Sequence, residues 1–199
     1  MLGFDCSGTL LHDIDQVYHA TCKLHEECGI PSPSLKEWKM FPKSSIIEYA
    51  KWKNFPISSE IAFSHLASHY LENPSCPEPY PSVVEALELA SKHFQLAVVS
   101  YHPNDCLIRD LTESHIIEFF KFVSGGQEPK EDRIRKIEPK VMCYIGDMAS
   151  DVRAANLAGV LPICVGTGYQ NINELRELAP SFSTLLEAVQ FAIYLKSKS

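Results

Sequence analysis

The second half of the chain alternates short apolar runs with segments of helical periodicity. Apolar runs at 94–99, 122–123, 141–145 and 161–165 each end at a serine or glycine, and helical patterns separate them. Strands that alternate with helices favour parallel pairing, because each crossover returns the chain to the same edge of a sheet. Together with the apolar residues before Asp5, these runs predict an α/β fold, a doubly wound parallel sheet of five strands.

The first 80 residues have a different pattern. Between 13 and 72 the apolar residues recur at helical spacing, and no strand is predicted there. The segment 73–81 contains four prolines, which exclude a regular helix or a central strand and favour a stiff linker. We therefore expect a core domain of residues 1–12 and 81–199, and a helical cap domain with its linkers at 13–80.

Helix starts and stops refine this outline. Ser34 with Glu37, and Ser82 with Glu85, have the spacing of a capping box, in which the serine and the acidic residue bond each other's backbone amides. Helices are predicted at 13–28, from Ser34, 58–71, from Ser82, from Asn104, 129–137, 151–158 and 184–196.

Polar side chains gather where the predicted strands end. Asp5, Ser100 and Asp147 directly follow strands, and Lys130 and Asp151 lie in the helices that come next. In a parallel sheet these ends face the same edge, which is where ligands bind in open α/β sheets. Three carboxylates brought together repel one another unless they are protonated or neutralised. Oxygen donors alone suit a hard cation such as Mg²⁺.

Two of these segments resemble signatures of the haloacid dehalogenase-like (HAD) hydrolases. Residues 5–10, Asp-Cys-Ser-Gly-Thr-Leu, are similar to the first signature, Asp-x-Asp-Gly-Thr-Leu, and residues 146–151 match the fourth, Gly-Asp-x-x-x-Asp. Ser100 and Lys130 stand at the positions of the second and third signatures of that family. The resemblance covers nearly the whole chain, including the helical insertion, and is greatest to the phosphoglycolate-phosphatase-like subgroup.

The resemblance implies roles for these residues. Asp5 would attack phosphorus to form an aspartyl-phosphate, and Asp5, the Ser7 carbonyl, Asp147 and Asp151 would hold Mg²⁺. Because Asp5 and Asp147 would share the metal, the first and fourth strands should be neighbours, which gives the strand order 3-2-1-4-5. Ser100 and Gly8 would bind phosphate.

Lys130 would neutralise developing negative charge at the phosphate. Lys121, Lys136 and Lys140 are less suitably placed, since two precede strands and one lies a helix length away. The family usually has Lys-Pro at this signature, whereas this chain has Pro129-Lys130.

Ser7 is the main departure from the family pattern. It replaces the aspartate that protonates the leaving oxygen and then activates water. Loss of a positioned acid and base typically slows a reaction by about 10²–10⁴-fold. We therefore expect slow turnover, a persistent phosphorylated Asp5, and a gain in alkyl phosphate hydrolysis from Ser7→Asp. His12 or Asp13 would be the substitutes nearest in sequence.

Three other functions are compatible with parts of the pattern. Dehalogenation fits poorly, because the acidic fourth signature is present. Phosphonate C–P hydrolysis fits a small residue at position 7 and would use a cap lysine such as Lys23. A catalytically weak module that binds a phosphorylated ligand or a protein is favoured by Ser7 and opposed by the retained Asp5, Asp147 and Asp151.

The net charge limits the classes of binding partner that we expect, and the cysteines limit the cellular compartment. The net charge is -7 and lysine and arginine form no run, so neither nucleic acid nor an anionic membrane is an expected partner. We expect a small phosphorylated substrate, and the oligomeric state stays open. The seven cysteines are unclustered and no leader is visible, which favours reduced thiols in the cytoplasm. A metal site in the series His19, Cys22, His25 and Cys28 is disfavoured by its spacing.

Overall fold

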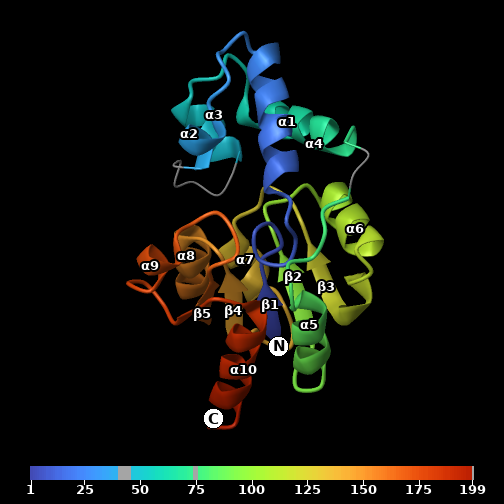
Figure 1. The fold of residues 1–199 in the computed structure, drawn as a ribbon, viewed down its shortest axis with the longest axis vertical. Coiled ribbons are helices and arrows are strands. Elements are labelled where there is room, and N and C mark those ends of the chain that lie inside the picture. The colour runs from blue at the N-terminus through green and yellow to red at the C-terminus, as the bar shows by residue number, and fades with distance from the viewer. Residues whose placement is uncertain (40–45, 74–75, 199) are drawn as a thin grey trace.

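The computed structural model describes residues 1–39, 46–73 and 76–198, and its centre is a parallel sheet that confirms the predicted fold (Figure 1). The strand order is β3-β2-β1-β4-β5-β6. β1 (Leu2–Phe4) lies between β2 (Leu96–Val99) and β4 (Cys143–Gly146), and pairs with both in parallel. β3 (Phe120–Ser124) and β5 (Leu161–Val165) flank them. The expected neighbourhood of the first and fourth strands is thus confirmed.

Three short elements were not predicted. β6 (Ser181–Phe182) adds a sixth strand beside β5, through bonds such as Gly166 N–H to the Phe182 carbonyl at 2.9 Å. α9 (Ile172–Leu175) is a single turn, and α3 (Ile46–Trp52) has seven residues. Elements of this length show too few repeats for a periodic pattern to stand out in the sequence.

The two predicted capping boxes have different outcomes. At α2 (Leu35–Lys39), the Ser34 amide donates to Glu37 Oε2 at 2.8 Å and the Glu37 amide donates to the Ser34 hydroxyl at 3.3 Å, which confirms the first box. At α5 (Val83–Ser91) the prediction was wrong, because the Ser82 side chain makes no capping bond. Ser82 has a left-handed backbone with φ of 67°, whereas a capping serine needs an extended one.

Alternate strand residues pack on opposite faces of the sheet, as the two-residue period of a strand requires. Leu96 and Val98 belong to a core that includes α5 and α10 (Leu185–Lys196). Ala97 and Val99 belong to a second core. The helices of that second core are α7 (Lys130–Arg135) and α8 (Ala149–Ala158). Both faces of the sheet are therefore covered.

Helices α1 (Ile14–Glu27), α2, α3 and α4 (Ser59–Leu71) form a separate group beyond the carboxyl ends of the strands (Figure 1). Two chain segments join this group to the sheet, and they run side by side. The His12 amide donates to the Glu78 carbonyl at 2.9 Å, and the Tyr80 amide to the Leu10 carbonyl at 3.0 Å. That the group is a cap domain in its own right stays a prediction.

The helical group also contacts the sheet side of the molecule through α6 (Asn104–Glu113). The Tyr70 hydroxyl of α4 donates to Asp110 Oδ2 of α6 at 2.8 Å, and both side chains are buried. Arg109 Nη1 donates to the Leu71 carbonyl at 3.4 Å. These bonds fix one flank of the helical group above the sheet.

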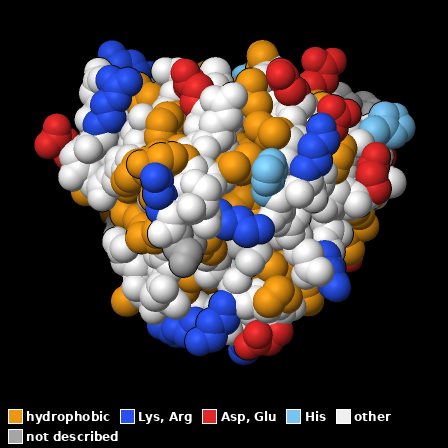
Figure 2. Space-filling view, turned by 90° about the horizontal axis from the view of Figure 1, so that it is seen from below, with side chains coloured by type: hydrophobic (Ala, Val, Ile, Leu, Met, Phe, Trp, Pro, Cys, Tyr) orange, Lys and Arg blue, Asp and Glu red, His pale blue; other side chains and the backbone are white. Residues whose placement is uncertain are grey.

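General surface features agree with the composition. None of the described helices combines the length and the apolar character needed to cross a membrane. All seven cysteines lie in described segments, and all are free thiols. Figure 2 views the end opposite α1–α4, where basic side chains stand in separate groups among acidic and apolar ones.

Candidate active site

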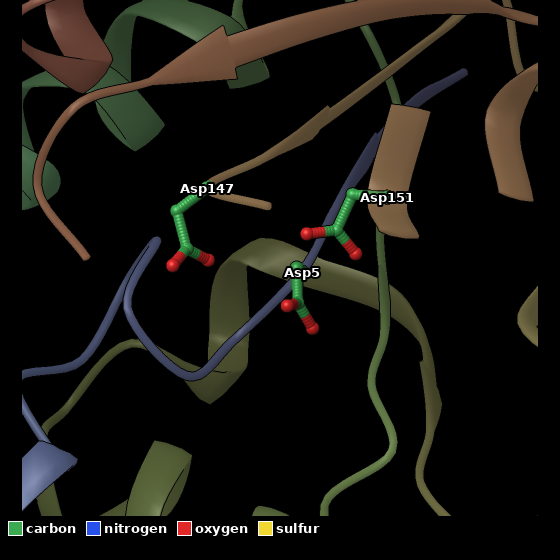
Figure 3. Close-up of side chains that lie close together, drawn as sticks. All are labelled: Asp5, Asp147 and Asp151. Atoms are coloured by element: carbon green, nitrogen blue, oxygen red, sulfur yellow. The ribbon is translucent and has the colours of Figure 1, made fainter. Parts of the chain in front are cut away.

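Three carboxylates converge at the carboxyl edge of the sheet. Asp5 follows β1, Asp147 follows β4, and Asp151 lies in the first turn of α8. One ligand atom of each lies within 4.8 Å of the others, and all three residues are buried (Figure 3). Among the described residues, this is the one cluster of three or more His, Cys, Asp or Glu side chains that could hold a metal ion. The series His19, Cys22, His25 and Cys28 therefore gains no support as a metal site.

Asp147 is held by the loops on both sides of it. The Thr9 hydroxyl donates to Oδ1 at 3.0 Å, and the Tyr169 amide donates to Oδ2 at 2.8 Å. Gly8 and Gly168 make this approach possible, because a Cβ on either would lie 2.4 or 2.1 Å from Asp147 Oδ2. Gly8 also has a φ of +75°, which disfavours any side chain there.

Lys130 bridges two of the three carboxylates. Its Nζ lies 2.9 Å from Asp5 Oδ1 and 2.7 Å from Asp151 Oδ1, and the side chain is 2 % exposed. Burial alone would lower the pKa of Lys130, but the carboxylates of Asp151 and Asp5 outweigh it and hold the pKa well above its ordinary value. Lys136, by contrast, is exposed and pairs with Glu128 at 3.4 Å.

The single positive charge of Lys130 does not offset the repulsion among the three carboxylates. Burial, then Asp151 and Asp5, raise the pKa of Asp147 well above its ordinary range. Burial raises the pKa of Asp151 to about 6 even though Lys130 opposes the shift. A divalent cation would relieve both shifts, and a donor set made only of oxygens suits a hard cation. The residues present therefore fit a metal of this kind.

Ser100 and Gly8 lie beside the cluster. Ser100 is buried after β2, and its side chain lines the same cavity as Asp5 and Lys130. The Ser100 hydroxyl accepts a bond from the His102 amide at 3.3 Å. The Gly8 amide donates to the Leu11 carbonyl at 3.1 Å, so it closes the turn. Phosphate binding by either residue stays a prediction.

Ser7 is paired with a buried carboxyl. Its hydroxyl donates to Asp13 Oδ2, and Asp13 is 1 % exposed. Burial raises the pKa of Asp13 to about 6, although His102 and the Ser7 bond oppose the shift. The Tyr169 hydroxyl lies 3.5 Å from Asp13 Oδ1. His12, the other substitute considered, is exposed and packs against Tyr80.

A buried polar network continues from Asp13 and was missed by the sequence. His102 Nδ1 lies 3.9 Å from Asp13 Oδ2, and its Nε2 lies 3.2 Å from Asp110 Oδ2. Asp110 also accepts bonds from Tyr70 and Arg109. No motif marks these residues. Tyr169 was also missed, although its place just beyond the Gly166-Thr167-Gly168 strand end is a usable signal.

A cavity of about 130 Å³ lies between the helical group and the site. Asp5, Ser7, Ser100 and Lys130 line one end of it. Aromatic residues line much of the rest, and Trp38 of α2 contacts Tyr169 at 5.7 Å between ring centroids. Lys23 is not among the residues that line the cavity and pairs with Glu72 at 2.9 Å, which weakens the case for phosphonate cleavage.

Known proteins share this sequence pattern and this fold. The haloacid dehalogenase-like hydrolase family matches residues 3–165. A phosphoglycolate phosphatase from Nitrosococcus oceani is 25% identical over 201 residues, which cover 90% of this chain and 89% of that protein. A haloacid dehalogenase-like hydrolase from Streptococcus pneumoniae has a TM-score of 0.79 at 20% identity, over 96% of both chains.

A mutant of CbbY from Rhodobacter sphaeroides, in complex with xylulose 1,5-bisphosphate, has a TM-score of 0.74 at 16% identity over 94% of both chains. The family match spans most of the chain, from β1 to the end of β5, and includes every strand that carries a residue of the site. The chain belongs to the haloacid dehalogenase-like hydrolases.

Proposed function

We propose that this chain is a Mg²⁺-dependent phosphatase that acts on a small phosphorylated compound through an aspartyl-phosphate at Asp5. The observation that carries the proposal is the buried cluster of Asp5, Asp147 and Asp151 around Lys130. Two related proteins support the proposal, since one is a phosphoglycolate phosphatase and the other is known in complex with xylulose 1,5-bisphosphate.

Each residue of the cluster has a distinct part in the proposal. Asp5, Asp147, Asp151 and the Ser7 carbonyl would hold the cation, which would supply positive charge to the phosphoryl oxygens when bound. Asp5 supplies the carboxylate oxygen that attacks phosphorus. Lys130 neutralises charge on the phosphoryl group and restrains Asp5 by the ion pair between them.

The helical group completes the site in this proposal. As a cap domain at 13–80, it would exclude water from the reacting group when it sits over the strand ends. Its two connections run side by side, so they would act together as one hinge. The contact of Trp38 with Tyr169 would help to hold the helical group in that position.

A binding module is the second candidate, and Ser7 favours it because its hydroxyl is committed to Asp13. Purified protein should be screened against metabolite phosphates with and without Mg²⁺. We expect Mg²⁺-dependent phosphate release that Asp5→Asn abolishes, and a phosphoryl group on Asp5 by mass spectrometry. Asp15→Asn, an exposed site on α1, is the matched control. Tight phosphate binding with neither release nor phosphorylated Asp5 would support the binding module instead.

A further inference from the structure

Aromatic side chains form much of the lining of the cavity. They are Trp38, Tyr49, Phe63, Tyr70 and Tyr169, which we call the aromatic wall. The cavity volume of about 130 Å³ is close to that of an engineered apolar cavity, about 150 Å³, that binds benzene. The space therefore has room for one small ring.

The tyrosines offer this cavity their rings rather than their hydroxyls. The Tyr49 hydroxyl is bonded to His25 Nε2 at 2.9 Å, and the Tyr70 hydroxyl donates to Asp110 at 2.8 Å. The Tyr169 hydroxyl faces Asp13 at 3.5 Å. Because their polar ends are engaged, these side chains contribute aromatic surface, which favours edge-to-face contact with another ring.

Few cations are present for a second anionic group on the substrate. Among the described lining residues the lysines are Lys39 and Lys130. Lys130 already pairs with Asp5 and Asp151, and Lys39 is exposed at the end of α2. A carboxylate beside the substrate's phosphate would therefore pair only with the exposed Lys39, and an exposed ion pair contributes about 0–1 kcal/mol.

Two side chains of the lining that could protonate a leaving oxygen, Ser7 and His102, are engaged by buried carboxylates. The Ser7 hydroxyl donates to Asp13. His102 is buried, with its Nε2 3.2 Å from Asp110 and its Nδ1 3.9 Å from Asp13. A phenolate needs no such help, because a phenol, with a pKa of about 10, is a far stronger acid than water or an alcohol.

From the aromatic wall and the engagement of Ser7 and His102 by carboxylates, we infer that the preferred substrate is an aryl phosphomonoester. This inference rests on the proposed phosphatase function. A carboxylate oxygen of Asp5 forms a bond to phosphorus while the P–O bond to the ring oxygen breaks, and the electron pair leaves on the phenolate. Water then cleaves the aspartyl-phosphate, which releases inorganic phosphate and restores Asp5. The phenolate takes its proton from solvent.

The test separates the ring from the leaving group with four compounds and Mg²⁺ present. Phenyl phosphate has a ring and a good leaving group, and benzyl phosphate has a ring and a poor one. Acetyl phosphate has a good leaving group without a ring, and 2-phosphoglycolate has neither. We expect lower KM for the two ring compounds, faster phosphorylation of Asp5 in single-turnover experiments for the two good leaving groups, and the highest kcat/KM for phenyl phosphate.

Two variants test the wall itself. Trp38→Ala and Phe63→Ala should each raise KM for phenyl and benzyl phosphate about three- to tenfold more than KM for acetyl phosphate, the loss expected for one aromatic contact. Tyr194→Ala removes an aromatic side chain that is 56% exposed on α10, and should change no constant. Thermal unfolding of each variant checks that it is folded.

The inference is overturned if 2-phosphoglycolate or acetyl phosphate has the highest kcat/KM. It is also overturned if benzyl and phenyl phosphate phosphorylate Asp5 at the same single-turnover rate, since an acid would then be present, or if both wall variants affect all four compounds equally. In each of these cases the phosphatase function would stand. If folded, Mg²⁺-loaded protein hydrolysed none of the four, and none left a phosphoryl group on Asp5, both proposals would fall.

Discussion

At the scale of single residues, the hydrogen bond between Ser7 and Asp13 determines which substitutions could restore a catalytic acid. In the sequence, Ser7 is a missing acid that Ser7→Asp should restore. In the structure, the new carboxylate would lie against Asp13, which is 1 % exposed. Two neighbouring carboxyls in a buried site cannot both ionise cheaply. Restoring an acid at position 7 therefore needs a substitution at Asp13 as well as at Ser7.

We predict that Ser7→Asp alone raises alkyl phosphate hydrolysis little, and that Ser7→Asp combined with Asp13→Asn raises it by about 10²–10⁴-fold. The amide at position 13 would be able to donate to the new carboxylate instead of repelling it. Steady-state kinetics on benzyl phosphate measures the effect, with Asp13→Asn alone as control. Equal rates for the single and double variants would show that Asp13 does not oppose the repair.

At the scale of elements, the buried bond between α4 and α6 fixes the helical group to the sheet. Tyr70→Phe removes only the hydroxyl that donates to Asp110, which keeps His102 and Arg109 as partners. Hydrogen bonds to charged groups contribute about 1.5–3 kcal/mol, so we expect a loss of that size in the free energy of unfolding. Urea denaturation measures it. Tyr194→Phe, at a half-exposed position, should cost nothing measurable.

Elements also show how far the sequence alone reaches. Strand and helix alternation predicted the sheet, and the need for Asp5 and Asp147 to meet predicted its order. The carboxylate cluster followed because strand ends share an edge. The contact of Tyr70, His102 and Asp110 did not follow, because Tyr70 lies 40 residues from Asp110 in the chain and no motif marks any of the three. Ser82 was misread because a capping sequence does not fix the backbone angle that capping needs.

At the scale of the whole molecule, the buried carboxyls make stability depend on pH and on metal. Asp13 and Asp151 have pKa values of about 6 in the folded state, above their ordinary 3.8. A raised pKa means that the fold favours the protonated form. Their contribution to stability is therefore complete below about pH 4 and is lost as the pH rises to about 6.

We predict that metal-free protein loses several kcal/mol of unfolding free energy across this window, about 3 kcal/mol for each carboxyl, and that excess Mg²⁺ above about pH 6 restores the share of Asp151, which would hold the cation, but not that of Asp13. The cation binds the ionised carboxylates, so it should stabilise little at about pH 4, where they are protonated. Chemical denaturation across the range, with chelator or with Mg²⁺, measures both. A Mg²⁺ effect that is the same at every pH would contradict the assignment.

The central place of β1 has a consequence for how this protein is made. Leu2 pairs with Leu96 on one side and with Cys143 on the other. During translation the first strand must therefore wait until most of the chain has left the ribosome, whereas the contacts among α1, α3 and α4 are more local and can form earlier. An apolar strand without partners invites wrong associations in that interval. Synthesis of this chain should accordingly be sensitive to the supply of chaperones that shield nascent chains.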